Sequence, residues 1–229
     1  MKRLLRLITA VVLAAASTAL PQTSTVALAA ECQHDSVHYY AQALSGYSNS
    51  VSGTGAWTTS WSTWYVSTSN GFSDVAVWLW DDSGHFLEGG FYTGAGVTVP
   101  WTNSMLPYYT LDNGQHEHDY AGDVLTTNAN TWMEVHDQPS TYSTYVKIQS
   151  FYLYPGTYTM LTPRHNFSQG EVATNTSTWM GGSGSGETFS GLWSDSGGSW
   201  HYWGFHNDCA NTPYWIKSVS SDSWTIGGR

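Results

Sequence analysis

The sequence predicts an all-β fold, an antiparallel β-sandwich made of two sheets. Strand-like stretches of roughly 6 to 10 residues follow one another along the chain, separated by breaks that contain Gly or Pro. The composition agrees, because 23 Gly, 13 Trp and 15 Tyr favour turns and pleated, half-buried surfaces. We find no stretch of helical length in which apolar residues recur with a helical period.

Alternating side chains support the main strands one by one. In the stretch 72–81, Val75, Val77 and Leu79 point to one side and the intervening Ala and Trp residues to the other. The stretches 132–137 and 145–152 alternate in the same way. Each stretch therefore predicts a strand with one face toward a core.

The first thirty residues predict a secretory signal peptide. Lys2, Arg3 and Arg6 precede an apolar run, and Ala27-Leu28-Ala29 is typical of a cleavage site. A retained N-terminal anchor is the alternative. We therefore expect residues 1–30 to be the signal and residues 31–229 to form one β-sandwich domain of a secreted, extracellular protein.

The remaining chain is strongly acidic. Without the three basic residues of the signal, 4 Lys and Arg stand against 17 Asp and Glu. Nucleic acids and anionic membranes attract clusters of Lys and Arg, so we expect neither as a partner. We expect a monomer.

The two cysteines lie near the ends of the predicted domain. In a secreted protein, Cys32 and Cys209 are expected to form one disulfide, with two free buried thiols as the alternative. Closing a loop of that length would stabilise the fold by about 4–5 kcal/mol on the chain-entropy model.

Two carboxylates stand in apolar, glycine-flanked stretches that otherwise predict strands. Glu88 shares its face with Gly90 and Tyr92, and Glu171 shares its face with Ala173. We expect the glycines beside Glu88 to leave open space for a ligand or another backbone. If both acids line one sheet face, repulsion and burial keep one protonated beside an ionised partner, which is a pair able to activate water.

These segments resemble the neprosin family of glutamic endopeptidases. The resemblance is carried by Phe72 to Leu79, by Leu87-Glu88-Gly89-Gly90-Phe91, by Gly170-Glu171-Val172 and by Thr176 to Gly181. It implies Glu88 and Glu171 as the catalytic pair, a β-sandwich, acid-active hydrolysis of polypeptides after proline, and no metal or other cofactor. Trp179 stands where the family has Gln, and we expect Trp179 and Tyr92 to contact the substrate.

A weaker resemblance links the middle of the chain to fungal-type glutamic peptidases. It is carried by Tyr108-Tyr109-Thr110, Ala121 to Val124 and Trp132 to Asp137. It implies a concanavalin-like jelly roll and the same class of reaction.

Two other functions remain open. The surplus of Trp and Tyr would also suit a non-catalytic, lectin-like sandwich that binds glycans, with some tryptophans in the core and others along a groove. Two carboxylates could also serve a glycosidase.

The stretch His116-Glu117-His118-Asp119 could ligate a metal, because His116 and His118 would share a face on a strand. We instead expect a polar loop without metal.

Overall fold

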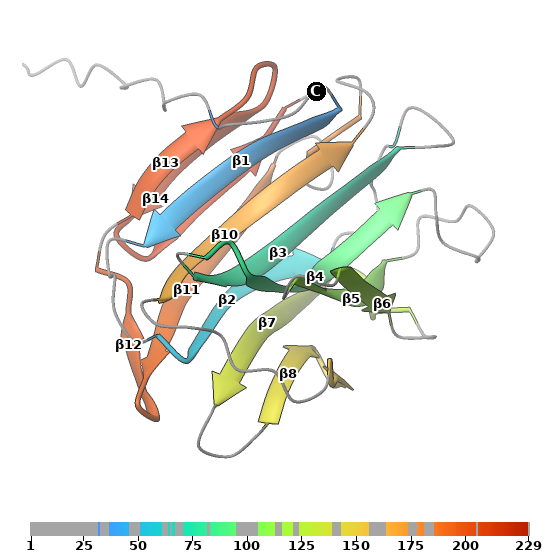
Figure 1. Ribbon diagram of the computed structural model, residues 1–229. Helices are drawn as coiled ribbons and strands as arrows, with labels where there is room; N and C mark the ends of the chain where they lie inside the picture. Colours follow the sequence, from blue (N-terminus) through green and yellow to red (C-terminus); the bar gives the residue numbers. More distant parts are fainter. Residues whose placement is uncertain are drawn as a thin grey trace, which may run out of the picture.

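The computed structural model is an antiparallel β-sandwich without helices in its described part (Figure 1), which confirms the predicted fold class. It describes residues 32, 37–45, 51–60, 64, 66, 71–81, 83–94, 105–112, 116–120, 124–138, 143–155, 164–173, 178–180, 186–204 and 206–228. The predicted signal peptide, residues 1–30, lies outside these ranges. No helix in them has the length and apolar character that crossing a membrane requires.

One sheet has seven strands in the order β13-β1-β10-β3-β4-β5-β6, all paired antiparallel. Strand β10 is thus inserted between β1 and β3, although about 80 residues separate it from β3. This sheet carries both carboxylates singled out in the sequence. Its strands are β1 (His38–Ser45), β3 (Phe72–Asp81), β4 (Phe86–Gly94), β5 (Leu106–Asp112), β6 (His116–Tyr120), β10 (Arg164–Ala173) and β13 (His206–Ala210).

The second sheet has eight strands in the order β14-β15-β11-β2-β7-β8-β9, with β12 paired to β11 beside that path. Its central strands β2, β7 and β11 each have a neighbour on both sides. The strands are β2 (Gly53–Ser60), β7 (Ala129–Gln138), β8 (Ser143–Ile148), β9 (Phe151–Leu153), β11 (Glu187–Ser196), β12 (Ser199–Tyr202), β14 (Trp215–Ser220) and β15 (Ser223–Gly227).

The core lies between the two sheets. Val75, Val77 and Leu79 of β3 are all fully buried there, as their alternation predicts. From the other sheet, the rings of Phe189 and Trp224 stack with centroids 4.6 Å apart. Burying one such side chain stabilises the fold by about 1.5–3 kcal/mol, so this layer holds the sheets together.

Two local expectations are wrong. The stretch 145–152 is a hairpin: β8 ends at Ile148, and β9 begins at Phe151, which pairs with Ile148. Gln149, with a φ of 54°, makes the turn possible although no Gly or Asn marks it. The stretch 116–120 is not a loop but the edge strand β6, because its backbone pairs with β5.

The disulfide between Cys32 and Cys209 is present, as predicted. Cys209 belongs to the edge strand β13, and the Asn211 side-chain amide donates to the Cys32 carbonyl oxygen over 2.7 Å. The start of the described chain is therefore tied to the edge of the seven-stranded sheet.

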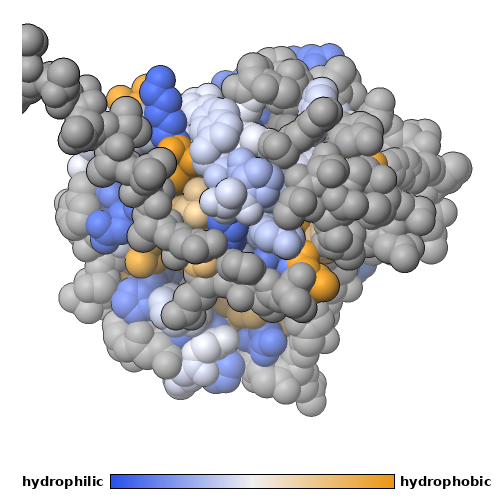
Figure 2. All heavy atoms as spheres, turned by 90° about the horizontal axis from the view of Figure 1, so that it is seen from above, coloured by the Kyte–Doolittle hydropathy of each residue, from blue (hydrophilic) through white to orange (hydrophobic). Residues whose placement is uncertain are grey.

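Seen from above, the hydrophobic residues of the described surface stand apart from one another (Figure 2).

Candidate active site

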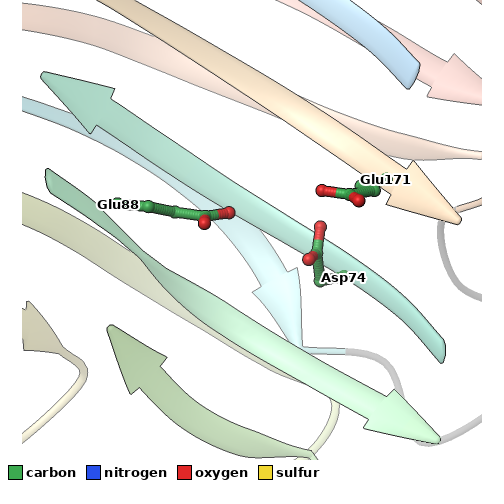
Figure 3. Close-up of side chains that lie close together, drawn as sticks. All are labelled: Asp74, Glu88 and Glu171. Atoms are coloured by element: carbon green, nitrogen blue, oxygen red, sulfur yellow. The ribbon is translucent and has the colours of Figure 1, made fainter. Parts of the chain in front are cut away.

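Three carboxyl groups converge on the outer face of the seven-stranded sheet. Glu171 on β10, Asp74 on β3 and Glu88 on β4 come from three adjacent strands. Asp74 lies directly opposite Glu171, whereas Glu88 is paired with Trp78 and its side chain points back toward the other two (Figure 3). One carboxyl oxygen of each lies within 4.8 Å of the others. The structure therefore brings Glu88 and Glu171 together on one sheet face, a condition that the strand pattern left open, and adds a third acid.

Strand alternation decides which way these side chains point. Because Val75 and Val77 fill the core, their neighbours Asp74 and Ala76 face away from the second sheet. Ala76 is paired with Gly90, so only small residues lie between the Asp74 and Glu88 positions on β3 and β4. Side chains of this size leave room for the carboxyl groups to reach one another.

The glycines beside Glu88 leave no open space for a ligand, but the expected close approach of another backbone is present at Gly90. A Cβ at Gly90 would collide with the carbonyl oxygen of Val75 in the neighbouring strand. A Cβ at Gly89 would collide with Val135 and Val146 of the other sheet. The close approach that glycine allows is therefore made by this protein's own packing.

A tyrosine joins two of the carboxyl groups. The hydroxyl oxygen of Tyr108, on β5, lies 2.5 Å from Glu88 Oε1 and 3.0 Å from Asp74 Oδ2. The hydroxyl has one proton, so it can donate fully to only one of them. When both contacts are hydrogen bonds, the other carboxyl group carries a proton and donates to Tyr108.

Burial favours protonated acids here. Glu88 is 5% exposed, and burial raises its pKa from 4.5 to about 7, although hydrogen bonds from Tyr108 and Thr110 oppose the rise. Burial also raises the pKa of Asp74 well above its ordinary value, and the charges of Glu171 and Glu88 raise it further. Over the acid range, Asp74 and Glu88 therefore favour their neutral forms.

Side-chain amides orient the third carboxyl group. The Gln42 amide donates to Gln169 Oε1 over 2.8 Å, so the amide nitrogen of Gln169 faces Glu171. This Gln169 nitrogen donates to Glu171 Oε2 over 3.3 Å. His38 Nε2 lies 3.9 Å from Glu171 Oε1. The amide and the imidazole therefore lie on two different oxygens of the Glu171 carboxyl group and fix its orientation.

The two predicted substrate-binding residues lie differently. Tyr92 is on β4 opposite Asp74, and its ring packs edge to face on Tyr108 with centroids 5.4 Å apart. It is thus next to the carboxyl groups. Trp179 lies outside the strands, and its carbonyl oxygen accepts a hydrogen bond from Ser73, whose side chain points away from the face that carries Asp74.

Sequence reasoning did not assign a role to Asp74, Tyr108 or Gln169. Asp74 gave the same signal as Glu88, a lone charge in an alternating apolar strand. Tyr108 and Gln169 gave no such signal, because each is an ordinary polar residue whose partners come from other strands.

The arrangement suits acid–base chemistry on a water molecule, since it places an oriented carboxyl group beside two acids whose pKa values are raised. The same three oxygens could also hold a hard cation such as Ca²⁺ or Mg²⁺, which prefers carboxylate ligands. The two uses make different predictions about chelators.

Fold and site together define a β-sandwich with a buried carboxyl cluster on one outer sheet face. The chain is similar in fold to several solved structures. A scytalidoglutamic peptidase with a peptide-based transition-state analogue matches at a TM-score of 0.56 and 10% identity, over 84% of this chain and 100% of that one. The same kind of peptidase with a transition-state analogue inhibitor matches at a TM-score of 0.54 and 12% identity, over 85% of this chain and 99% of that one.

SCP-B, an eqolisin-family peptidase in complex with the tripeptide Ala-Ile-His, matches at a TM-score of 0.53 and 11% identity, over 84% of this chain and 100% of that one. At this identity the likeness shows a shared fold. No sequence-family model and no curated relative matches the chain.

Proposed function

We propose that this protein is a secreted, acid-active glutamic endopeptidase that hydrolyses peptide bonds with Glu171 and Glu88. The observation that carries the proposal is the approach of the two carboxyl groups, with one oxygen of each within 4.8 Å on a single sheet face. The fold shared with glutamic peptidases supports it.

Glu171 is the general base in this mechanism. Oriented by the Gln169 amide, its ionised form takes a proton from a water molecule that attacks the peptide carbonyl carbon. Glu88, with a pKa raised to about 7, is protonated in acid and donates to the developing oxyanion or to the leaving amine. Asp74 and Tyr108 are positioning residues, because the Tyr108 hydroxyl contacts both carboxyl groups and orients that of Glu88.

The range of activity follows from these protonation states. Raising the pH toward 7 ionises Glu88 and removes the acid, so cleavage should fall between pH 6 and 8. Secretion and a preference for cleavage after proline rest on the predicted signal peptide and on the resemblance to neprosins. Tyr92 and Trp179 are the proposed substrate contacts.

The test is cleavage of an acid-denatured protein between pH 3 and 6 by the parent and by Glu171→Gln. We expect Glu171→Gln to lower kcat at least about a hundredfold, the usual size of a general-base contribution. Asp119→Asn, which neutralises an exposed acid of the same sheet, should cleave like the parent. Equal rates for Glu171→Gln and the parent would exclude the proposed base.

Two further assays separate the remaining functions. Cleavage that survives EDTA supports a reaction by the carboxyl groups alone, and cleavage lost to EDTA and restored by Ca²⁺ or Mg²⁺ contradicts it. Release of reducing sugar from a glycan panel, without peptide cleavage, would favour a glycosidase instead.

A further inference from the structure

The outer face of the second sheet carries a hollow of about 630 Å³, on the opposite side of the sandwich from the carboxyl cluster. It extends over β2, β7, β8, β11 and β12, and the proposed peptidase reaction uses none of its residues. We call it the indole trough. Its defining residues are Trp57, Trp132, Trp193, Trp200, Glu134 and Lys147.

Register and a glycine place the indoles. Trp57 and Trp132 are directly paired between β2 and β7, and their ring centroids lie 5.2 Å apart at 54°. Gly55, two residues before Trp57, is paired with both Glu134 and Trp193. A Cβ at Gly55 would overlap the Trp132 ring, so the glycine lets that ring lie across β2. The four indoles therefore line the trough over the middle of the sheet.

Hydrogen bonds fix the floor of the trough. Trp132 Nε1 donates to Glu134 Oε2 over 2.8 Å, and the Tyr145 hydroxyl donates to the other carboxylate oxygen. Glu134 is only 8% exposed, and Lys147 lies opposite it on the neighbouring strand β8. The Lys147 ammonium lies 5.2 Å from the Tyr152 ring centroid. The trough thus contains one carboxylate and one ammonium, which leaves it without net charge.

This lining matches a sugar better than a peptide. The faces of indole rings are electron-rich and attract the C–H groups of a pyranose ring, while the Glu134 and Lys147 side chains can bond its hydroxyls. A peptide that pairs by its backbone needs a free strand edge. The central strands β2, β7 and β11 offer none, because each is already paired on both sides.

We propose that the indole trough is a non-catalytic binding site for a neutral oligosaccharide. A neutral ligand fits the balanced charges of the trough and avoids repulsion from a chain with net charge −10. The site is independent of the peptidase proposal, because its residues lie on the other sheet.

The test is retention of the purified protein on cellulose, chitin and β-1,3-glucan particles at neutral pH. We expect retention on at least one of them and a loss of about tenfold in affinity for Trp57→Ala, because this substitution removes one of the ring faces on which a pyranose would pack. Trp215→Ala is the matched control: Trp215 and Trp57 are both 39% exposed and both belong to the second sheet. Glu171→Gln should bind like the parent.

A second measurement does not depend on any variant. Titration of the parent with soluble hexasaccharides of glucose and of N-acetylglucosamine should change its tryptophan fluorescence in a saturable way. No retention and no fluorescence change with any of these glycans would overturn the proposal. Retention that Trp57→Ala leaves unchanged would also overturn it. A higher KM of Trp57→Ala for protein substrates, without glycan binding, would make the trough a peptide site instead.

Discussion

The outer faces of the two sheets differ in what strand alternation brings to them. On the seven-stranded sheet, alternate positions of three strands bring Asp74, Glu88 and Glu171 together above Ala76 and Gly90. On the eight-stranded sheet, the same alternation brings tryptophans together above Gly55. The same alternation of side chains thus produces a buried carboxyl cluster on one sheet face and an open aromatic surface on the other. The two faces should be separable by mutation.

The largest effect should come from filling the glycines. Gly90→Ala should lower the free energy of unfolding by about 3 kcal/mol, because its Cβ would collide with the Val75 backbone, which cannot move aside cheaply. Gly55→Ala should cost about 1–2 kcal/mol, because part of the collision is with the Trp132 ring. Urea unfolding of both variants measures the difference. Gly55→Ala should keep peptide cleavage and lose glycan retention; the reverse pattern would contradict the separation of the two faces.

Stability should depend on pH through the carboxyl face. Glu88 has a folded pKa of about 7 against an ordinary value of 4.5, so the folded state binds more protons between these values. The stability from Glu88 is therefore complete below about pH 4.5 and is lost as the pH rises through 7. The loss amounts to about 3 kcal/mol.

The raised pKa of Asp74 acts in the same direction. Urea unfolding at intervals from pH 4 to 8 should show this decline in the parent and in Asp119→Asn, and a flatter curve in Glu88→Gln. Parallel curves for the parent and Glu88→Gln would show that burial does not raise this pKa. Trp57→Ala should keep the slope of the parent.

Removing one hydroxyl should have a smaller effect. Tyr108→Phe deletes a hydrogen bond that lowers the pKa of Glu88, so that pKa should rise further. We expect kcat to fall by up to about tenfold, the upper value of one hydrogen bond between neutral groups, and the alkaline limb of the pH profile to move upward. Tyr109→Phe is the control, because Tyr109 packs in the core between the sheets. A pH profile of Tyr108→Phe that matches the parent's would show that the Tyr108 hydroxyl does not influence Glu88 and that Tyr108 only packs there.

The smallest effects should come from the proposed substrate contacts. Tyr92→Ala and Trp179→Ala should each raise KM by about three- to tenfold, with little change in kcat, because these side chains would contact the substrate away from the reacting bond. Tyr92 should have the larger effect, since it lies beside Asp74. Steady-state kinetics on one peptide measures both constants. A drop in kcat alone for Tyr92→Ala would instead indicate that its contact with Tyr108 orients the acids.

The faces of individual strands were predictable, whereas strand partners were not. The burial of Val75, Val77 and Leu79 and the outward direction of Glu88 follow from a period of two residues. The contact of Tyr108 with Glu88 and Asp74 depends on β5, β4 and β3 lying in that order. The turn at Gln149 was missed because its positive φ is adopted by a residue that rarely favours it.

The sequence alone therefore determined the fold class, the disulfide and the side of the sheet on which Glu88 and Glu171 lie, since each depends on local alternation or on two cysteines. Only the tertiary structure decided that β10 pairs with β3, about 80 residues earlier in the chain, and so brings Glu171 opposite Asp74. It also decided which tryptophans form the core and which line the indole trough. These contacts depend on which strands pair, and strands distant in the sequence pair here. A tryptophan or a carboxylate at an alternating position would suit a strand of either sheet, so the local pattern does not specify its neighbours.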